Sequence, residues 1–220
     1  MQRRTIDLMV SGAGLMLAVV LIVFGVYFND RHQFAQNNVH DQLVAQKVSF
    51  PPKSALTPEE LKQPGVVKFA GQPVDDGEKA QVYADEFIAL HLRESSGGKT
   101  YAELGGPQFA LQDQIAAAEK TNDPALPELQ AQLDELKATR NTLFTGETLR
   151  GLLLTTYGFW QFGQEAQLAT YVSFGAAGIL FALVGLGMVH ALRTRRSEAV
   201  RPVEPTTPVS REKKVPAFAN

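Results

Sequence analysis

The chain has 220 residues, of which 45% are hydrophobic, and a formal net charge of −2 at pH 7. These totals resemble those of an ordinary globular protein, and we expect no nucleic-acid partner. The chain has no cysteine, which excludes disulfide bonds and thiolate chemistry. The averages conceal two very apolar runs, separated by a polar middle segment that is long enough for one domain with a modest core.

The two apolar runs are residues 8–28 and 168–192, and neither contains a charged side chain. A bilayer core needs about 20 apolar residues in a helix, so each run predicts a transmembrane helix. The first run is longer than the apolar part of a typical signal peptide, and no small-x-small cleavage motif follows it, so we interpret it as an uncleaved anchor. Without intramembrane charges, we expect no ion path through this chain alone.

The charges around the runs predict the orientation. Arg3 and Arg4 precede the first run, whereas Arg193, Arg195 and Arg196 directly follow the second, and the segment between the runs is net acidic. Basic residues near membrane spans are retained on the cytoplasmic side. We therefore expect a two-pass protein of the cell membrane, with both termini cytoplasmic and the middle segment outside.

These observations predict a mainly α membrane protein, in which two transmembrane helices flank a small extracytoplasmic helical bundle. The expected parts are a cytoplasmic N-terminus (1–7), a first transmembrane helix (8–28), an extracytoplasmic helical domain (29–145), an interfacial aromatic segment (146–167), a second transmembrane helix (168–192) and a disordered basic cytoplasmic tail (193–220).

Small residues form a stripe on each predicted span, where they allow close backbone approach in lipid. We expect them to pack the spans on each other or on a partner's span. The residues concerned are Gly14, Ala18 and Gly25 in the first span and Gly175, Gly178, Ala182 and Gly185 in the second.

The middle segment has helical periodicity in several stretches. The first helix is expected to continue past residue 30 and to stop at Phe50-Pro51-Pro52, and Thr57 and Glu60 have the spacing of a capping box at the start of a short helix. The remainder of the proline-rich stretch up to Gly77 is expected to be an extended loop.

Further helices are predicted at 78–94, ended by Gly97-Gly98, and at 108–120. A heptad-like seam then begins after Asp123-Pro124, which favours an antiparallel helical hairpin in a small bundle. The residues of the seam are Leu126, Leu129, Leu133, Leu136 and Leu143.

Aromatic residues gather just before the second run, including the only tryptophan of the chain. Such rings favour the headgroup zone of a bilayer, so this segment is expected to lie on the outer leaflet or to bend into the span. The predicted interface residues are Tyr157, Phe159, Trp160 and Phe162, together with Arg150, which could meet lipid phosphate.

Several local patterns of the middle segment together resemble a family of actinobacterial two-span membrane proteins of uncharacterised function. They are Gln42-Leu43 with Gln46-Lys47 before Phe50-Pro51, the run Phe69-Ala70-Gly71-Gln72-Pro73-Val74, Tyr83-Ala84-Asp85 with His91-Leu92, Gly97-Gly98-Lys99-Thr100-Tyr101, and Leu143-Phe144 with the run from Gly146 to Leu154 and Tyr157-Gly158. Some members carry an automatic label of aromatic ring-opening dioxygenase, which would imply an iron site.

The residues do not predict such a site. An iron oxygenase typically needs two histidines and a carboxylate that converge. His32, His40 and His91 have no metal-binding spacing, and His91 borders an apolar helix face, which favours a structural role. Gly98-Lys99-Thr100 lacks the first glycine of a phosphate-binding loop and is expected to be a helix-ending turn. We therefore expect neither a metal nor another cofactor.

The sequence favours a non-enzymatic, membrane-anchored accessory or scaffold protein, whose outside helical domain docks onto another membrane or envelope protein. One alternative is a two-span sensor that signals through a separate cytoplasmic partner, bound to tail residues such as 211–214. A weaker alternative is an extracytoplasmic enzyme, with His91, Asp85 and Arg93 as the least implausible participants.

Overall fold

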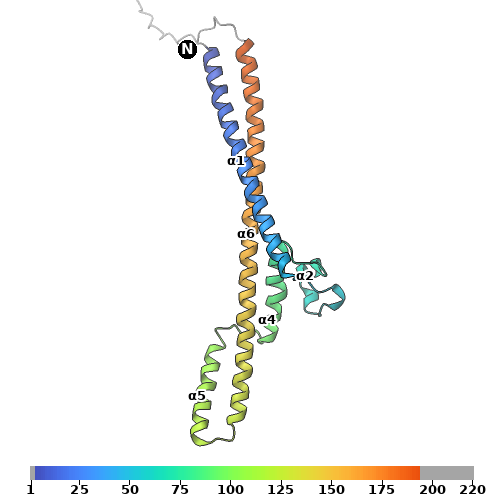
Figure 1. The fold of residues 1–220 in the computed structure, drawn as a ribbon, viewed down its shortest axis with the longest axis vertical. Coiled ribbons are helices and arrows are strands. Elements are labelled where there is room, and N and C mark those ends of the chain that lie inside the picture. The colour runs from blue at the N-terminus through green and yellow to red at the C-terminus, as the bar shows by residue number, and fades with distance from the viewer. Residues whose placement is uncertain (1–2, 194–220) are drawn as a thin grey trace, which may run out of the picture. The chain divides into compact units, whose positions relative to one another are not determined.

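The computed structural model describes residues 3–193 and is mainly helical (Figure 1). Its elements are α1 (Arg3–Gln46), η1 (Lys53–Ala55), η2 (Glu60–Lys62), α2 (Pro64–Phe69), α3 (Gly77–Val82), η3 (Tyr83–Ile88), α4 (Ala89–Ser95), α5 (Gly105–Thr121) and α6 (Leu126–Arg193). By length and composition, α1 and α6 could each cross a membrane. The expected mainly α class with two potential spans is confirmed, whereas all but Arg193 of the predicted tail lies outside the described residues.

The chain divides into two compact units. We call Val23–Ser173 the central unit, and Met1–Ile22 with Phe174–Asn220 the span unit. Both α1 and α6 contribute residues to each unit, and the smaller elements belong to the central unit.

In the central unit, the end of α1 and the loops that follow it build the main hydrophobic core. Lys47 adopts a left-handed φ of 54° and ends α1, so the helix does continue past residue 30, as predicted. The backbone amide of Phe50 then donates to the Gln72 carbonyl at 2.9 Å, and that of Val74 donates to the Val48 carbonyl at 2.9 Å. The core cluster consists of Val39, Leu43, Phe50, Val66, Phe69, Val74 and Ala80.

The capping box predicted at Thr57 is present. The Thr57 amide donates to the Glu60 carboxylate at 2.6 Å, and the Glu60 amide donates to the Thr57 hydroxyl at 3.2 Å. The turn that follows is only the 3₁₀ segment η2, and a true helix, α2, begins at Pro64. The prediction of a loop was therefore wrong there, because Pro64 at the first helical position favours a helix start.

The helix predicted over 78–94 is confirmed as the continuous run of α3, η3 and α4, but its middle segment, η3, is π-helical. The run ends as predicted at Gly97 and Gly98, whose φ values are 60° and 81°. The Gly98 amide donates to the Arg93 carbonyl at 2.8 Å and the Gly97 amide to the Glu94 carbonyl at 3.4 Å, which is the Schellman pattern.

The predicted antiparallel hairpin is formed by α5 and the first part of α6 (Figure 1). Arg140 of α6 donates to the side chain of Gln108 of α5, and its guanidinium lies 4.1 Å from the centre of the Tyr101 ring. Leu143 packs with Leu92 and Leu104 in a second buried cluster. From Leu126, α6 runs without interruption to Arg193, so the segment 146–167 is part of one helix.

In the span unit, α1 and α6 are in close contact. A Cβ on Gly14 would approach Val184 Cγ2 to 2.9 Å, and a Cβ on Gly187 would approach Ser11 Oγ to 2.7 Å. Small residues are buried at this contact, which is the packing that helices use in lipid. They are Ser11, Ala18, Ala177 and Ala191.

Candidate functional site

The central unit contains an apolar cleft of about 580 Å³. It lies among the end of α1, the loop after it, the π-helical segment η3 and the middle of α6. The lining residues are Gln42, Leu43, Gln46, Val48, Val74, Tyr83, Ile88, Leu149, Leu152, Leu153, Thr155 and Thr156. A cleft of this volume is within the range of small-molecule sites in proteins.

The cleft lining carries no charged side chain, and its hydroxyl groups on α6 are already bonded. Thr155 donates to the Gly151 carbonyl at 2.8 Å, and Thr156 donates to the Leu152 carbonyl at 3.0 Å. Within the part of the chain that the structure describes, no buried polar side-chain atom of the lining lacks a hydrogen-bond partner. The walls therefore offer an occupant mainly apolar contact.

One wall of the cleft is the π-helical segment η3, which Arg150 of α6 clamps. Arg150 Nε donates to the Ala84 carbonyl at 3.0 Å, and Nη2 donates to the Asp85 carboxylate at 3.2 Å. The third guanidinium nitrogen, Nη1, donates to Glu147 at 2.8 Å, one turn away on the same helix. Because π-helical turns are rare and frequently occur at functional sites, the clamped segment marks this wall as a built feature.

Tyr83 connects the cleft to the main core. Its ring lies 5.2 Å from the Phe50 ring, edge to face, and 4.8 Å from the Phe87 ring. Burial raises the pKa of the Tyr83 phenol, because the ionised form loses solvation there. The phenol is thus held neutral and contributes an aromatic face to the cleft.

Trp160 packs on the first turn of α3, which sequence reasoning missed. A Cβ on Gly77 would overlap the Cβ and ring atoms of Trp160, so the backbone at Gly77 contacts the side chain directly. The ring is partly buried against the main core cluster and stacks with Tyr157 at 6.1 Å. In the sequence, the only hint of this contact is that a glycine directly follows Asp76, the residue that caps α3.

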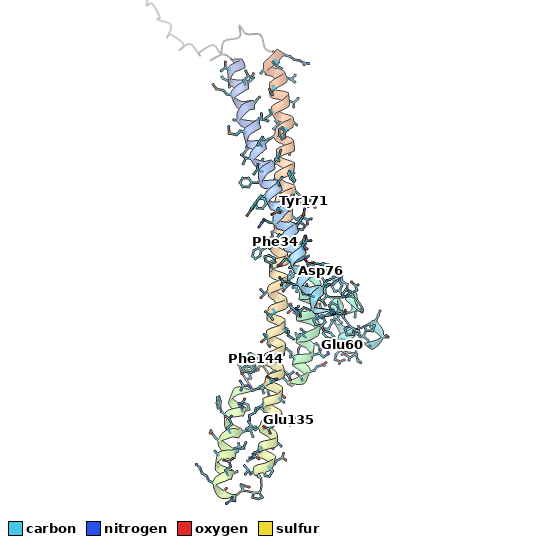
Figure 2. All side chains as sticks on the ribbon, in the orientation of Figure 1. Phe34, Glu60, Asp76, Glu135, Phe144 and Tyr171 are labelled. Carbon is cyan, nitrogen blue, oxygen red and sulfur yellow. The ribbon has the colours of Figure 1, made fainter. Side chains whose placement is uncertain are left out.

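Near the cleft, apolar side chains remain exposed on one face of α6. Leu149 is 50% exposed and Leu152 61% exposed, and Phe159, seven residues further along the same face, is 37% exposed. Phe34 of α1, 55% exposed and labelled in Figure 2, meets Phe159 edge to face at 6.2 Å. We call Phe34, Leu149, Leu152 and Phe159 the apolar strip.

The predicted interface residues thus have different environments. Phe162 is exposed, and Phe159 is partly exposed, whereas Tyr157 and Trp160 pack within the central unit. That Arg150 meets lipid phosphate stays a prediction, and the structure shows its guanidinium donating to Ala84, Asp85 and Glu147. A carboxylate on a helix distant in sequence cannot be inferred from the composition of the segment 146–167.

The predicted small-residue stripes also differ. Gly14 and Ala18 lie at the α1–α6 contact, and Gly25 is buried in the central unit. On α6, Ala182 is exposed and the three predicted glycines are exposed with open space around their Cα atoms. The buried face of α6 is another one, with Thr170, Ser173, Ala177, Val184 and Ala191 at spacings of three, four and seven. The exposed stripe is Gly175, Gly178, Ala182 and Gly185.

Contacts with α1 inside each unit decide which face of α6 is buried. In the central unit, a Cβ on Gly163 would approach the Ala35 Cβ to 2.8 Å, so α1 and α6 are in close contact at this position. A step of seven residues from Gly163 leads to Thr170 on the same helix face. In the span unit, the contact of Gly14 with Val184 covers the face that contains Ala177 and Ala191. Both faces of the second span are rich in small residues, and the sequence alone does not distinguish them.

The candidate catalytic residues are engaged in separate contacts. His91 Nδ1 donates to the Phe87 carbonyl at 2.8 Å while its Nε2 lies 3.4 Å from the buried Glu60 carboxylate, and Asp85 is paired with Arg150. Arg93 lies in a shallow pocket with Lys99 and Arg150. Among residues 3–193, no three His, Asp or Glu side chains are grouped so as to hold a metal ion.

The other two histidines of the predicted outside domain also bond to backbone carbonyls. His32 Nδ1 donates to Gly163 at 2.8 Å, and His40 Nδ1 donates to Asp75 at 2.9 Å.

The Gly98-Lys99-Thr100 sequence forms a turn stabilised by a second capping box. The Thr100 amide and hydroxyl donate to the Glu103 carboxylate at 2.7 and 2.8 Å. These hydrogen bonds lower the pKa of Glu103. Thr100 is therefore used to start the turn that precedes α5.

Comparison of the chain with protein-family models, with curated proteins and with solved structures finds no match. The resemblance to actinobacterial two-span membrane proteins stays a prediction, and the functional argument rests on the geometry of the central unit.

Proposed function

We propose that this is a non-enzymatic, membrane-anchored accessory protein that presents an extracytoplasmic helical domain to another protein of the membrane or envelope. In this proposal α1 and α6 cross the cell membrane, both termini are cytoplasmic, and the central unit faces outward as a small bundle.

The apolar strip is the observation that carries this proposal. It exposes two leucines, which also line the cleft, and two phenylalanines, on the surface of a unit that buries its own core elsewhere. Large exposed side chains gathered on one face typically mark a site of protein or membrane contact. The exposed small-residue stripe of α6 supplies a second surface, suited to a partner's span.

The partner contact can be tested by a photo-crosslinking amino acid placed at Leu152, with the exposed Phe109 of α5 as the matched control position. We expect a discrete crosslinked protein from Leu152 and none from Phe109, in cells that express the protein at its native level. The same protein should co-purify in several mild detergents and be lost from the variant Phe159→Asn. Recovery of the uncrosslinked protein alone would contradict the proposal.

The orientation can be tested by single cysteines, since the chain has none. Ser54 is exposed in the central unit and is therefore a suitable position for a reporter cysteine. We expect Ser54→Cys to react with a membrane-impermeant thiol reagent in intact cells and Ser210→Cys to react only after lysis. The reverse pattern would place the central unit in the cytoplasm, and labelling of both in intact cells would mean that one apolar run does not span.

A further inference from the structure

We propose that the cleft of the central unit binds one long hydrocarbon chain, the acyl chain of a fatty acid or of a lipid taken from the bilayer. This inference goes beyond the accessory role: Leu149 and Leu152 belong both to the apolar strip and to the cleft lining, but a protein that binds no partner could still hold a lipid. It rests on the lining of the cleft, on its clamped wall and on its place along α1 and α6.

Apart from Gln42, Gln46 and the Tyr83 hydroxyl, the lining is poorly suited to hold water. A water molecule has a share of about 30 Å³ in the liquid, so a volume of about 580 Å³ corresponds to roughly 20 waters. The Thr155 and Thr156 hydroxyls already donate within α6, and the leucine, valine and isoleucine side chains offer no hydrogen bond. An apolar occupant that displaces such water gains affinity.

The absence of charge from the lining residues decides which chemical class fits. A sugar, a nucleotide or a peptide backbone would leave many polar groups unpaired in this cleft, and each would carry a desolvation cost. A hydrocarbon chain has no such groups. Its polar end would remain at the mouth, where the exposed Gln42 and Gln46 provide amide groups.

The wall formed by η3 has an unfavourable helical geometry that other contacts hold in place. Tyr83 and Ile88, the first and last residues of the π-helical segment, both line the cleft. Ala84 accepts from the Ala89 amide in the π pattern and also from Arg150 Nε. An unfavourable helical turn persists where surrounding contacts enforce it, and here those contacts shape the cleft wall.

The position along the helices explains why the occupant must be a chain that has left the bilayer core. Within the central unit, Gln42 follows Phe28, the last residue of the first apolar run, by about 21 Å of helix at 1.5 Å per residue. Thr156 precedes Leu168, the first residue of the second run, by about 18 Å on the same basis. A lipid whose headgroup stays in the leaflet points its chains toward the bilayer core and away from the cleft. The whole molecule is therefore taken up into the cleft.

The test uses the full-length protein in lipid nanodiscs with two probes, each carrying a diazirine at the chain end: free palmitate, and a phospholipid with the same chain. Crosslinks are mapped by mass spectrometry to residues 149–156 of the cleft and to residues 174–192 of the span. Labelling of the span by either probe is expected from the bilayer itself and serves as the internal standard. Cleft labelling by one probe alone identifies the source of the chain.

Competition by unlabelled palmitate distinguishes a saturable binding site from simple partitioning of the probe into the bilayer. A tenfold excess of unlabelled palmitate should lower cleft labelling about tenfold if the chains compete for one site, while span labelling stays nearly constant. Cleft labelling that follows span labelling under competition would overturn the proposal. The same holds if neither probe labels residues 149–156 above the exposed α5 residue Phe109.

Two variants with matched controls locate the chain. Thr156→Phe fills the cleft and should reduce cleft labelling about tenfold, whereas Thr142→Phe, an exposed α6 threonine that donates to its own helix in the same way, should not. Leu152→Glu adds a carboxylate at the mouth and should also reduce labelling, and Phe109→Glu is its control. Labelling that is insensitive to both cleft variants would refute the assignment.

Discussion

Replacing Gly77 by alanine should loosen Trp160 from the first turn of α3. The added Cβ would overlap the Cβ and ring atoms of Trp160, which belong to the stiff part of a side chain on another helix. Neither helix can yield easily, because Gly77 directly follows the Asp76 cap and Trp160 lies in the middle of α6. The substitution therefore tests whether Trp160 packs on the central unit.

The expected magnitude follows from two opposing terms. Alanine in place of a helical glycine gains up to about 1 kcal/mol of helix propensity. Overpacking of a close contact costs about 1–3 kcal/mol. With the full propensity gain subtracted, the net destabilisation of the central unit should then be up to about 2 kcal/mol. Gly106→Ala in α5, where no atom lies within 4 Å of the new Cβ, should instead stabilise by up to about 1 kcal/mol.

Trp160 is the only tryptophan, so its fluorescence reports on this contact directly. In nanodiscs, Gly77→Ala should shift its emission to longer wavelength and increase quenching by acrylamide, whereas Gly106→Ala should change neither. Lipids brominated near the headgroup should quench Trp160 only weakly in the native protein. Strong quenching by these lipids, together with no response to Gly77→Ala, would refute the packing and return Trp160 to the membrane interface.

Arg150→Lys should destabilise the π-helical segment by about 1–2 kcal/mol, because an ammonium cannot reproduce the paired contacts with Ala84 and Asp85, and hydrogen exchange of residues 83–88 should become faster while that of α5 is unchanged. Glu103→Gln should weaken the loss of thermal stability at acidic pH. The pKa of Glu103 is lowered from 4.5 in the folded state, so the stability that this carboxylate contributes is present above pH 4.5 and is lost as the pH falls through the lowered pKa. A melting midpoint whose pH dependence is unchanged by the substitution would contradict this. Leu143→Ala should cost about 2–5 kcal/mol of stability, since this leucine is buried in the second core cluster, and an unchanged melting midpoint would exclude the packing of α4 on α6.

Local signals predicted the individual helices well. The Thr57–Glu60 capping box, the Gly97-Gly98 end of α4 and the leucine seam of α6 involve residues within a few positions of one another. Local hydrogen bonds and periodicity decide such features, so they can be read without knowledge of distant contacts. Length and apolar composition likewise identified α1 and α6 as potential spans.

The cleft and its clamp could not be predicted in this way. Arg150 reaches Asp85 across 65 sequence positions, and its segment predicts only a polar residue near a membrane interface. The π-helical geometry of η3 has no periodicity that distinguishes it from an ordinary helix over a single turn.

The sequence by itself determined the helices, their caps and the two apolar runs, because these follow from composition and from spacings within a turn or two of helix. Only the tertiary structure decided which faces of the helices are covered. The second span offers two small-residue faces, and within the span unit the close contact of Gly14 with Val184 selects the one that contains Ala177 and Ala191. A tryptophan side chain is likewise favourable both at a bilayer interface and in a protein core. Because Gly77 has no Cβ, Trp160 can pack on the central unit. A side chain's chemistry limits its possible environments, and the packing of distant segments selects one of them.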